Sequence, residues 1–397
     1  MAGDLVCLGD SITFGSGGLR SEHGPPHGWV ALVANAISDQ TGAVASPGFR
    51  GTWLEEWGVS GAWQRRSEAI AADGAPFGRV LGPVADRSVA TWRTATPVAG
   101  AEVIVQGDPA GWEYRVDDGD WLGARFEASG PILASMAVER AIRTALELRP
   151  AVGGHELGGR AIVGIVPNAG AAPNATVHNL GLAEGLLSEF CRPTSGDPFA
   201  LLAHLDAAAV TILFTNDVVF ENESKYAARL ERLVERLRAG ARVLLISAFE
   251  QRPARAVSTV TWREGSCALD AGAAGFDAAD VGRHVSGEGL APGTRISAVE
   301  SSQRVVLDRV AHASGTGIVH VGFRRSAESQ AQHRHTAARV ARDRGVDHLD
   351  LFDLWAEIIG APGFDAAMRA GLMADALHPS PLGHDVIASA VLDWLTG

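Results

Sequence analysis

A strand–helix–strand unit in the second half of the chain constrains the fold more than any other feature. The runs Ala208–Phe214 and Arg242–Ser247 are almost continuously apolar, which is typical of strands buried on both faces of a parallel sheet. Between them, Glu223–Ala239 carries apolar residues at helical spacing and is followed by Gly240, a residue type that commonly ends a helix. Two such strands joined by a helix predict a doubly wound α/β sheet.

The same alternation recurs towards both ends of the chain. The expected elements are a strand at Asp4–Gly9, a helix at Gly28–Gln40, a helix at Ala327–Arg344, a strand at Val346–Phe352 and a last helix from Pro381 to Leu395. We expect four apolar residues of that last helix to form its buried stripe: Leu382, Val386, Ala390 and Trp394.

Two stretches interrupt this alternation. From about Trp53 to Pro167 the chain shows short alternating runs bounded by Gly, Asp and Pro, which is typical of a β-sandwich or jelly roll. A second stretch, from about Arg252 to Arg324, has the same character on a smaller scale. We therefore expect an α/β core built from residues 1–50, 171–252 and 326–397, an inserted β-sandwich domain at 51–170, and a small inserted β module at 253–325.

Tryptophans gather in the first of these insertions. Of the ten in the chain, those in or beside it are Trp53, Trp57, Trp63, Trp92, Trp112 and Trp121. Sandwich cores and strand edges commonly use tryptophan, so we expect packing to be their main role. A sugar-stacking surface is the alternative.

Charge and hydropathy exclude several kinds of partner. The formal net charge of -12, with no basic run, argues against nucleic acid or an anionic membrane as the main partner. No run reaches the roughly 18 apolar residues of a membrane-spanning helix, so no membrane insertion is expected. Residues 1–9 lack the basic and apolar regions of a signal peptide, and we expect folding in the cytoplasm.

Four short stretches fall where the predicted strands end: Gly9-Asp10-Ser11, Asn179-Leu180-Gly181, Asn216-Asp217 and Asp375-x-x-His378. The carboxyl ends of parallel strands meet at one edge of a sheet, where such folds place their chemistry. A serine nucleophile needs a base, and the base needs an orienting carboxylate. We predict that Ser11 is the nucleophile, His378 the base and Asp375 the orienting group.

The oxyanion formed during acyl transfer needs hydrogen-bond donors that are already in place. We predict three donors: the backbone N–H of Ser11, the backbone N–H of a glycine at the end of the second strand, and the side-chain amide of Asn216. Gly181 is preferred as the glycine because Asn-Leu-Gly follows an apolar run. Gly48 is the alternative.

These four blocks, in this order, resemble those of the SGNH, or GDSL, hydrolase superfamily of esterases and acylhydrolases. The resemblance covers residues 1–50 and 175–397 without the second insertion, and the stretch Leu377–His384 is typical of the family. It implies a flavodoxin-like, three-layer α/β/α fold and serine esterase chemistry with no cofactor and no metal. Gly48 lies at the family's usual distance from Ser11, which keeps it open as the runner-up to Gly181.

Side chains next to the blocks are candidates for the walls of a substrate pocket. The family usually has glycine two residues before Asn216, whereas this chain has Phe214, which we expect to change the wall beside the oxyanion hole. Asp10 and Asp217 are candidates as well, although for both the better interpretation is a hydrogen-bond acceptor that stabilises a turn.

Three other histidines are interpreted as structural. His333 and His335 stand two apart on a predicted helix, so they do not share a face as metal ligands would. We expect both on the solvated helix surface. His384, in the last helix, is expected to have a structural role.

The second insertion carries a separate resemblance. The stretch from Phe276 to Ile296 is similar to small β modules of actinobacteriophage tail proteins. The combination of an SGNH core with β insertions resembles a phage minor tail protein, which implies assembly into a phage tail and a place in the virion.

Three functions follow from these resemblances. The first is an esterase that removes acyl groups, acetyl among them, from a small-molecule ester, a cell-envelope glycan or a glycolipid. The second is a carbohydrate-binding tail or adhesin protein whose esterase core is inactive because Phe214 blocks the oxyanion hole. The third is a purely structural tail subunit, and a homo-oligomer is also left open.

Overall fold

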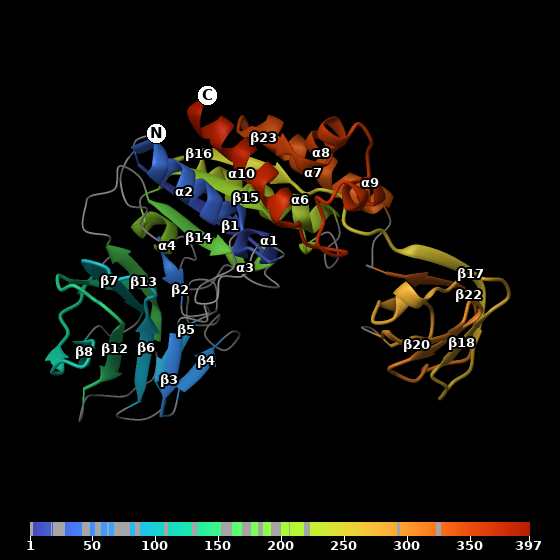
Figure 1. Ribbon diagram of the computed structural model, residues 1–397, viewed down its shortest axis with the longest axis horizontal. Coiled ribbons are helices and arrows are strands. Elements are labelled where there is room, and N and C mark those ends of the chain that lie inside the picture. The colour runs from blue at the N-terminus through green and yellow to red at the C-terminus, as the bar shows by residue number, and fades with distance from the viewer. Residues whose placement is uncertain are drawn as a thin grey trace.

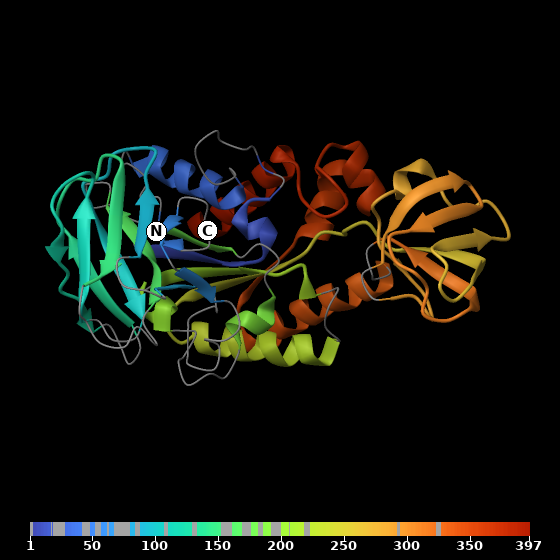
Figure 2. The same ribbon diagram turned by 90° about the horizontal axis from the view of Figure 1, so that it is seen from below.

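The computed structural model describes residues 3–16, 18, 28–41, 48–51, 57–61, 63–66, 80–83, 88–106, 110–128, 133–151, 161–168, 176–181, 186–191, 200–205, 207–217, 223–291, 294–322 and 327–397. These residues form an α/β core with an antiparallel β-sandwich near one end and a small β module beyond the other (Figures 1 and 2).

The core is built on one parallel sheet. Its strands are β1 (Asp4–Gly9), β14 (Val177–Gly181), β15 (Ala207–Leu213), β16 (Arg242–Ser247) and β23 (Asp347–Asp350). They lie in the order β14–β1–β15–β16–β23, and every pairing is parallel. Numbered along the chain this is the order 2-1-3-4-5 of a flavodoxin-like doubly wound sheet. The predicted fold class is confirmed.

Helices cover both faces of the sheet (Figure 2). One layer consists of α2 (Trp29–Thr41), α8 (Leu351–Ile359), α9 (Phe364–Arg369) and α10 (Pro381–Thr396). The other consists of α3 (Leu187–Phe190), α4 (Ala200–His204), α6 (Glu223–Leu237) and α7 (Ala327–Arg344). Successive residues of β1 alternate between these layers: Val6 and Leu8 belong to one buried cluster, Leu5 and Cys7 to the other.

The first insertion forms a two-sheet sandwich. One sheet contains β2 (Arg50–Gly51), β4 (Trp63–Arg66), β5 (Val80–Pro83), β7 (Gly100–Gln106), β10 (Glu127–Ala128), β11 (Leu133–Val138) and β13 (Ala161–Asn168). The other contains β3 (Trp57–Ser60), β6 (Val89–Arg93), β8 (Trp112–Val116), β9 (Leu122–Gly123) and β12 (Ala145–Pro150). The first sheet also packs on the α/β core, because Ile104 and Val163 share a buried cluster with Val6 and Leu8.

The sandwich tryptophans mainly pack. Trp57, Trp92 and Trp112 are at most 3% exposed and belong to the core between the two sheets. Trp121 carries the Arg149 guanidinium 3.9 Å above its ring. Trp53 and the side chain of Trp63 lie outside the described residues. Packing is therefore the role of the three buried rings, and these offer no sugar-stacking surface.

The second insertion is a separate six-stranded antiparallel sheet. Its strands are β17 (Arg255–Trp262), β18 (Ala268–Ala271), β19 (Val285–Ser286), β20 (Ile296–Ser301), β21 (Arg304–Leu307) and β22 (Gly315–Val321), with a short 3-10 helix at Ala278–Asp280. The module has its own buried cluster. Its two ends lie side by side, because a Cβ placed on Gly322 would lie 3.4 Å from the Cα of Ala254.

Two expectations near the C-terminal end are wrong. The predicted strand Val346–Phe352 ends at Asp350, where helix α8 begins, and neither α8 nor α9 was predicted. The reason is local, because the Asp350 carboxylate caps α8 by accepting from the Phe352 and Asp353 N–H groups.

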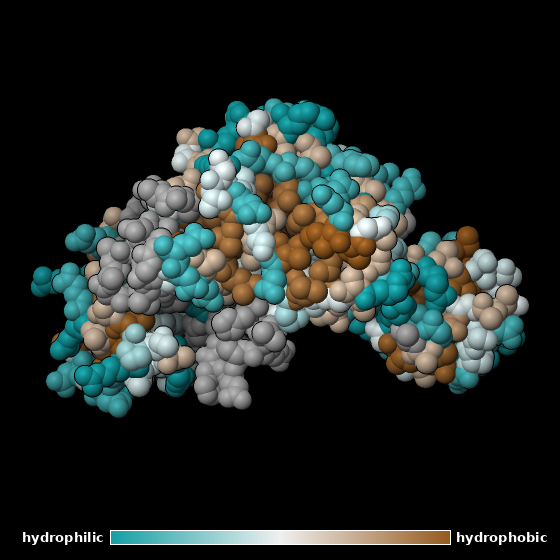
Figure 3. Space-filling view, turned by 45° about the horizontal axis from the view of Figure 1, so that its top comes forward, coloured by the Kyte–Doolittle hydropathy of each residue, from teal (hydrophilic) through white to brown (hydrophobic). Residues whose placement is uncertain are grey.

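The expected stripe of α10 is also displaced. Leu382 is 50% exposed, whereas Ile387 and Val391 are fully buried. Helix α10 has apolar residues on several sides, so spacing alone does not identify its buried face. Figure 3 shows apolar surface on the face that this helix layer forms. Exposed apolar side chains occur on three helices of the layer: Ile358 on α8, Met368 on α9 and Leu382 on α10. Among the described helices, none combines the length and hydropathy needed to span a membrane.

Candidate active site

The first strand delivers Ser11 to the carboxyl edge of the sheet. Helix α1 (Ser11–Phe14) begins directly after β1, and the Asp10 side chain caps it by accepting from the Ile12 N–H at 3.0 Å. Gly9 is required at the turn, because a Cβ there would lie 2.1 Å from the Thr13 Oγ1 and 2.3 Å from the Leu213 carbonyl oxygen. The end of β1 can therefore approach both α1 and β15 this closely only because Gly9 has no side chain.

Hydrogen bonds connect Ser11 to His378 and His378 to Asp375. The Ser11 Oγ is 3.2 Å from the His378 Nε2, and the His378 Nδ1 is 2.9 Å from the Asp375 Oδ2. Residues from the two ends of the chain thus meet as a nucleophile, base and orienting carboxylate must.

His378 is held by a local turn. The Asp375 Oδ1 accepts from the backbone N–H groups of Leu377 at 2.7 Å and His378 at 2.8 Å. Partial burial alone would raise the pKa of Asp375, but hydrogen bonds from the His378 ring and these N–H groups outweigh it and bring the pKa to about 2. The carboxylate therefore stays charged beside the imidazole at neutral pH.

Asp10 links Ser11 to the third block. Its Oδ2 accepts from the Thr215 N–H at 2.5 Å, the Thr215 hydroxyl at 2.6 Å and the Asn216 N–H at 3.0 Å. Asn216 therefore lies beside the turn that carries Ser11. The involvement of Thr215 was missed, although a hydroxyl residue directly before Asn216 at a strand end was a visible signal.

The two alternative glycines lie at opposite ends of β14. Gly181 pairs with Gly9, and a Cβ on it would lie 2.1 Å from the Phe14 nitrogen of α1. Gly48 packs instead against the carbonyl of Val177, four residues earlier, which is roughly 13 Å along a strand. Position therefore favours Gly181, whose N–H already donates to the Asn179 Oδ1 at 2.8 Å.

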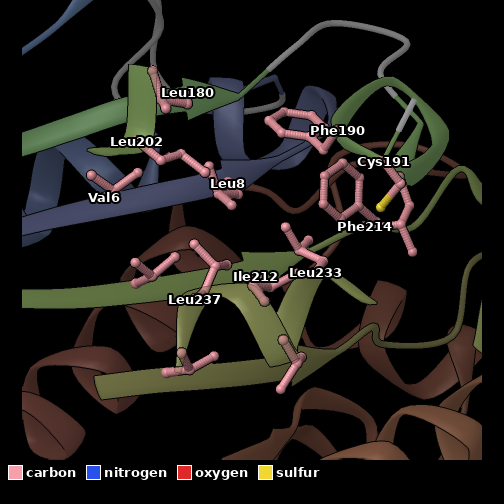
Figure 4. Packing of buried hydrophobic residues seen from close by; sticks show 14 of the residues in the cluster. Val6, Leu8, Leu180, Phe190, Cys191, Leu202, Ile212, Phe214, Leu233 and Leu237 are labelled. Carbon is pink, nitrogen blue, oxygen red and sulfur yellow. The ribbon is translucent and has the colours of Figure 1, made fainter. Parts of the chain in front are cut away.

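The three pocket-wall candidates are all buried, and the contacts of Asp10 and Asp217 agree with their preferred interpretation as hydrogen-bond acceptors. Asp10 and Asp217 are 0% exposed, and Phe214 is 4% exposed. The Phe214 ring meets Phe190 edge-on at 5.1 Å between centroids (Figure 4). It therefore contributes to the core under the sheet and does not form a wall beside the oxyanion position.

Asp217 lies in the same buried region. Its Oδ2 accepts from the Leu187 N–H at 2.8 Å. Burial is the main cause that raises its pKa to about 7, and the nearby Asp10 carboxylate adds to the shift.

The remaining histidines have different environments. His384 is fully buried, with Nδ1 accepting from the Trp29 N–H at 3.2 Å and Nε2 3.0 Å from the Ser16 carbonyl oxygen. This arrangement suits a neutral ring that donates from Nε2, and burial lowers the pKa of His384. His333 is 3% exposed, so its expected place on the solvated surface is wrong, while His335 is exposed. Within the described residues, no group of three or more His, Cys, Asp or Glu side chains could hold a metal ion.

Comparison with known proteins supports the fold. No protein-family model matches the chain, and no curated protein matches it. Among solved structures, a peptidoglycan O-acetylesterase superposes with a TM-score of 0.58 at 14% identity, over 100% of this chain and 91% of that one. An acetyl-xylooligosaccharide esterase mutant from Geobacillus Stearmophilus gives a TM-score of 0.31 at 13% identity, over 56% and 72% of the chains. The fold assignment rests on the first of these structures. The chain has the α/β/α fold that its resemblance to the SGNH hydrolases implied, carrying two inserted β modules.

Proposed function

We propose that the protein is a serine esterase of the SGNH type that acts through an acyl-enzyme. One observation carries the proposal: the Ser11 Oγ, the His378 imidazole and the Asp375 carboxylate follow one another at 3.2 and 2.9 Å. A purely structural or binding role would not require a serine, an imidazole and a charged carboxylate in this order.

The chemistry follows from these contacts. The His378 Nε2 accepts the Ser11 proton as Oγ attacks the ester carbonyl, and the tetrahedral intermediate collapses when His378 returns the proton to the leaving alcohol. Water, deprotonated by the same nitrogen, then releases the acid and restores Ser11. Asp375 keeps the proton on the His378 Nδ1 and stabilises the imidazolium that forms.

The oxyanion requires donors that meet it in the transition state. We assign this role to the Ser11 N–H and the Asn216 side-chain amide. Gly181 is a third donor. Its N–H already donates to the Asn179 side chain, so the oxyanion would have to share this donor with Asn179.

For the substrate we propose an acyl ester, with acetyl as the acyl group, on a cell-envelope carbohydrate. The fold shared with a peptidoglycan O-acetylesterase supports this choice. The inserted sandwich packs beside the nucleophile, because Phe14 of α1 contacts the buried cluster between its sheets. It is therefore in a position to contact the sugar. Assembly into a phage tail or a homo-oligomer remains a prediction, as does residence in the cytoplasm.

The inactive-core alternative loses its main argument. It required Phe214 to block the oxyanion position, and this side chain is buried against Phe190. Glycan binding without turnover is therefore the less favoured function.

The test compares the wild type with Ser11→Ala on p-nitrophenyl acetate and on O-acetylated peptidoglycan. A serine-directed fluorophosphonate, mapped by mass spectrometry, should label Ser11. Ser16→Ala is the matched control. It changes a serine five residues after Ser11 that does not belong to the proposed Ser11–His378–Asp375 triad. Equal rates for Ser11→Ala and the wild type would rule out the mechanism, and glycan binding without turnover would support the alternative.

A further inference from the structure

The Asp10 carboxylate joins two loops that contribute different groups to the site. One oxygen accepts from the Ile12 N–H in α1. The other accepts from the Thr215 N–H, the Thr215 hydroxyl and the Asn216 N–H in the segment after β15. The segments so joined are more than 200 residues apart in the sequence.

This link begins where the sheet stops. Strands β1 and β15 are paired up to Gly9 and Leu213, the last residue of each. Ser11 and Asn216 both lie beyond that pair, so the ladder of the sheet does not fix their separation. The Asp10 side chain connects the two segments, because Asp10 directly precedes Ser11 and its carboxylate accepts from the Asn216 N–H.

The link depends on a carboxylate. All four partners donate, and an ionised carboxylate can accept from all of them. An amide in the same place would turn its NH₂ group against the Ile12 N–H or against the Thr215 and Asn216 N–H groups. Asp10 is 0% exposed, so water cannot replace the lost bonds.

We infer that Asp10 is a positioning residue that sets the distance between the Ser11 nucleophile and the Asn216 amide that receives the oxyanion. This inference rests on the proposed function. Asp10 does not touch the reacting atoms; it acts through Asn216. Since the oxyanion contact is made in the transition state, loss of the link lowers kcat and leaves KM nearly unchanged.

The test is a double-mutant cycle between Asp10→Asn and Asn216→Ala, measured as kcat and KM on p-nitrophenyl acetate. Each single change should lower kcat by about 10²-fold, the size expected for losing or misplacing one oxyanion donor. The double variant should be within a few-fold of Asn216→Ala alone, because the two residues act as one unit. Multiplied losses in the double variant, or a wild-type kcat for Asp10→Asn, would overturn the inference.

Asp4→Asn is the control for replacing a hydrogen-bonded carboxylate elsewhere on β1, although the Asp4 side chain is 33% exposed. Asp4 lies at the other end of β1 and accepts from the Thr176 N–H at 2.8 Å, away from Ser11. It should lower stability without changing kcat. If Asp10→Asn does not fold, as judged by circular dichroism, Thr215→Val takes its place in the cycle. That change removes one donor to Asp10 and keeps the backbone, and losses that multiply with Asn216→Ala would again reject the inference.

Fluorophosphonate labelling separates this inference from the proposed function. If Ser11 is not labelled in the wild type and Ser11→Ala keeps its rate, both proposals fail. If Ser11 is labelled and the cycle is additive, only the role of Asp10 fails.

Discussion

Two turns carry the proposed catalytic groups, and they are held in place by different means. Residues 9–15, here called the nucleophile turn, carry the proposed nucleophile, and residues 371–380, the base turn, carry the proposed base. Asp10 is fully buried and bonded to a segment of another strand, whereas the Asp375 side chain is 55% exposed and bonded to its own turn. The core of the protein thus holds Asp10 and Ser11 directly. His378 is oriented by bonds within its own turn, which the buried Leu372 and Met373 anchor in the core. One backbone bond, from the Arg252 N–H to the Ala376 carbonyl at 2.9 Å, ties that turn to the loop after β16. We therefore expect substitutions in the base turn to lower kcat with little effect on stability. Substitutions in the nucleophile turn should change both kcat and stability.

The largest effect should come from His378→Ala. Removing the base should lower kcat by about 10⁴–10⁶-fold while the melting temperature stays within a few degrees, because the turn is held by backbone and Asp375 contacts. Ester hydrolysis and a thermal melt check both. His335→Ala, an exposed histidine on α7, should match the wild type. A His378→Ala enzyme that keeps more than a tenth of the activity would contradict the assigned base.

Asp375→Asn should lower kcat by about 10²–10⁴-fold. The amide oxygen can still accept from the Leu377 and His378 N–H groups, so the turn should keep its shape. What is lost is the charge beside the imidazole. Steady-state kinetics together with urea unfolding separate the two effects. A variant with the kcat of the wild type would contradict the orienting role of Asp375.

The two turns should also differ in their response to pH. The pKa of Asp217, beside the nucleophile turn, is raised by burial to about 7, so the folded state holds its proton more tightly than the unfolded chain does. Its contribution to stability is present below about pH 4 and is lost as the pH rises through 7. Asp375 behaves oppositely: its lowered pKa gives stability above about pH 4 that is lost as the pH falls towards 2.

Asp217→Asn tests this difference. The variant should gain about 2–4 kcal/mol of unfolding free energy relative to the wild type between pH 4.5 and 8, at about 1.4 kcal/mol per pKa unit. Urea unfolding at the two pH values measures the change. A gap between variant and wild type that stays constant with pH would reject the raised pKa of Asp217.

The smallest effects compare one hydrogen bond in each turn. Thr215→Val deletes the hydroxyl that donates to the buried Asp10 and should cost about 1.5–3 kcal/mol of unfolding free energy. Ser380→Ala deletes the cap whose oxygen accepts from the Gly383 N–H at the start of α10, and should cost about 1 kcal/mol. Equal costs by urea unfolding would remove the distinction between a core-held and a locally held turn.

Most of the architecture could be predicted because its signals are local and periodic. The apolar runs that became β15 and β16 and the helix between them differ from their predicted bounds by at most two residues. Helix α8 was missed because Asp350 ends a strand and caps a helix at the same time, and the predicted strand was extended two residues too far.

The orientation of Phe214 could have been predicted from spacing. Every second side chain along a strand points to the same face. On this spacing Phe214 follows Val210 and Ile212 of β15, and all three belong to the same buried cluster. Counting in steps of two from the strand would have placed the ring in the core. By contrast, the bond between the Asn179 side chain and the Gly181 N–H depends on a rotamer and could not have been read from residue types.

The meeting of Ala254 with Gly322 has a consequence for how the chain folds and how it can be engineered. An insertion whose ends already touch adds only a weakly length-dependent loop-closure entropy to the host, and this one has a buried cluster of its own. For the folding of the α/β core, the module therefore acts as one long loop. The 2-1-3-4-5 sheet can form before the module has folded. The same point of attachment is a suitable place to exchange the module for another compact domain. Such an exchange should leave the arrangement of Ser11, His378 and Asp375 unchanged.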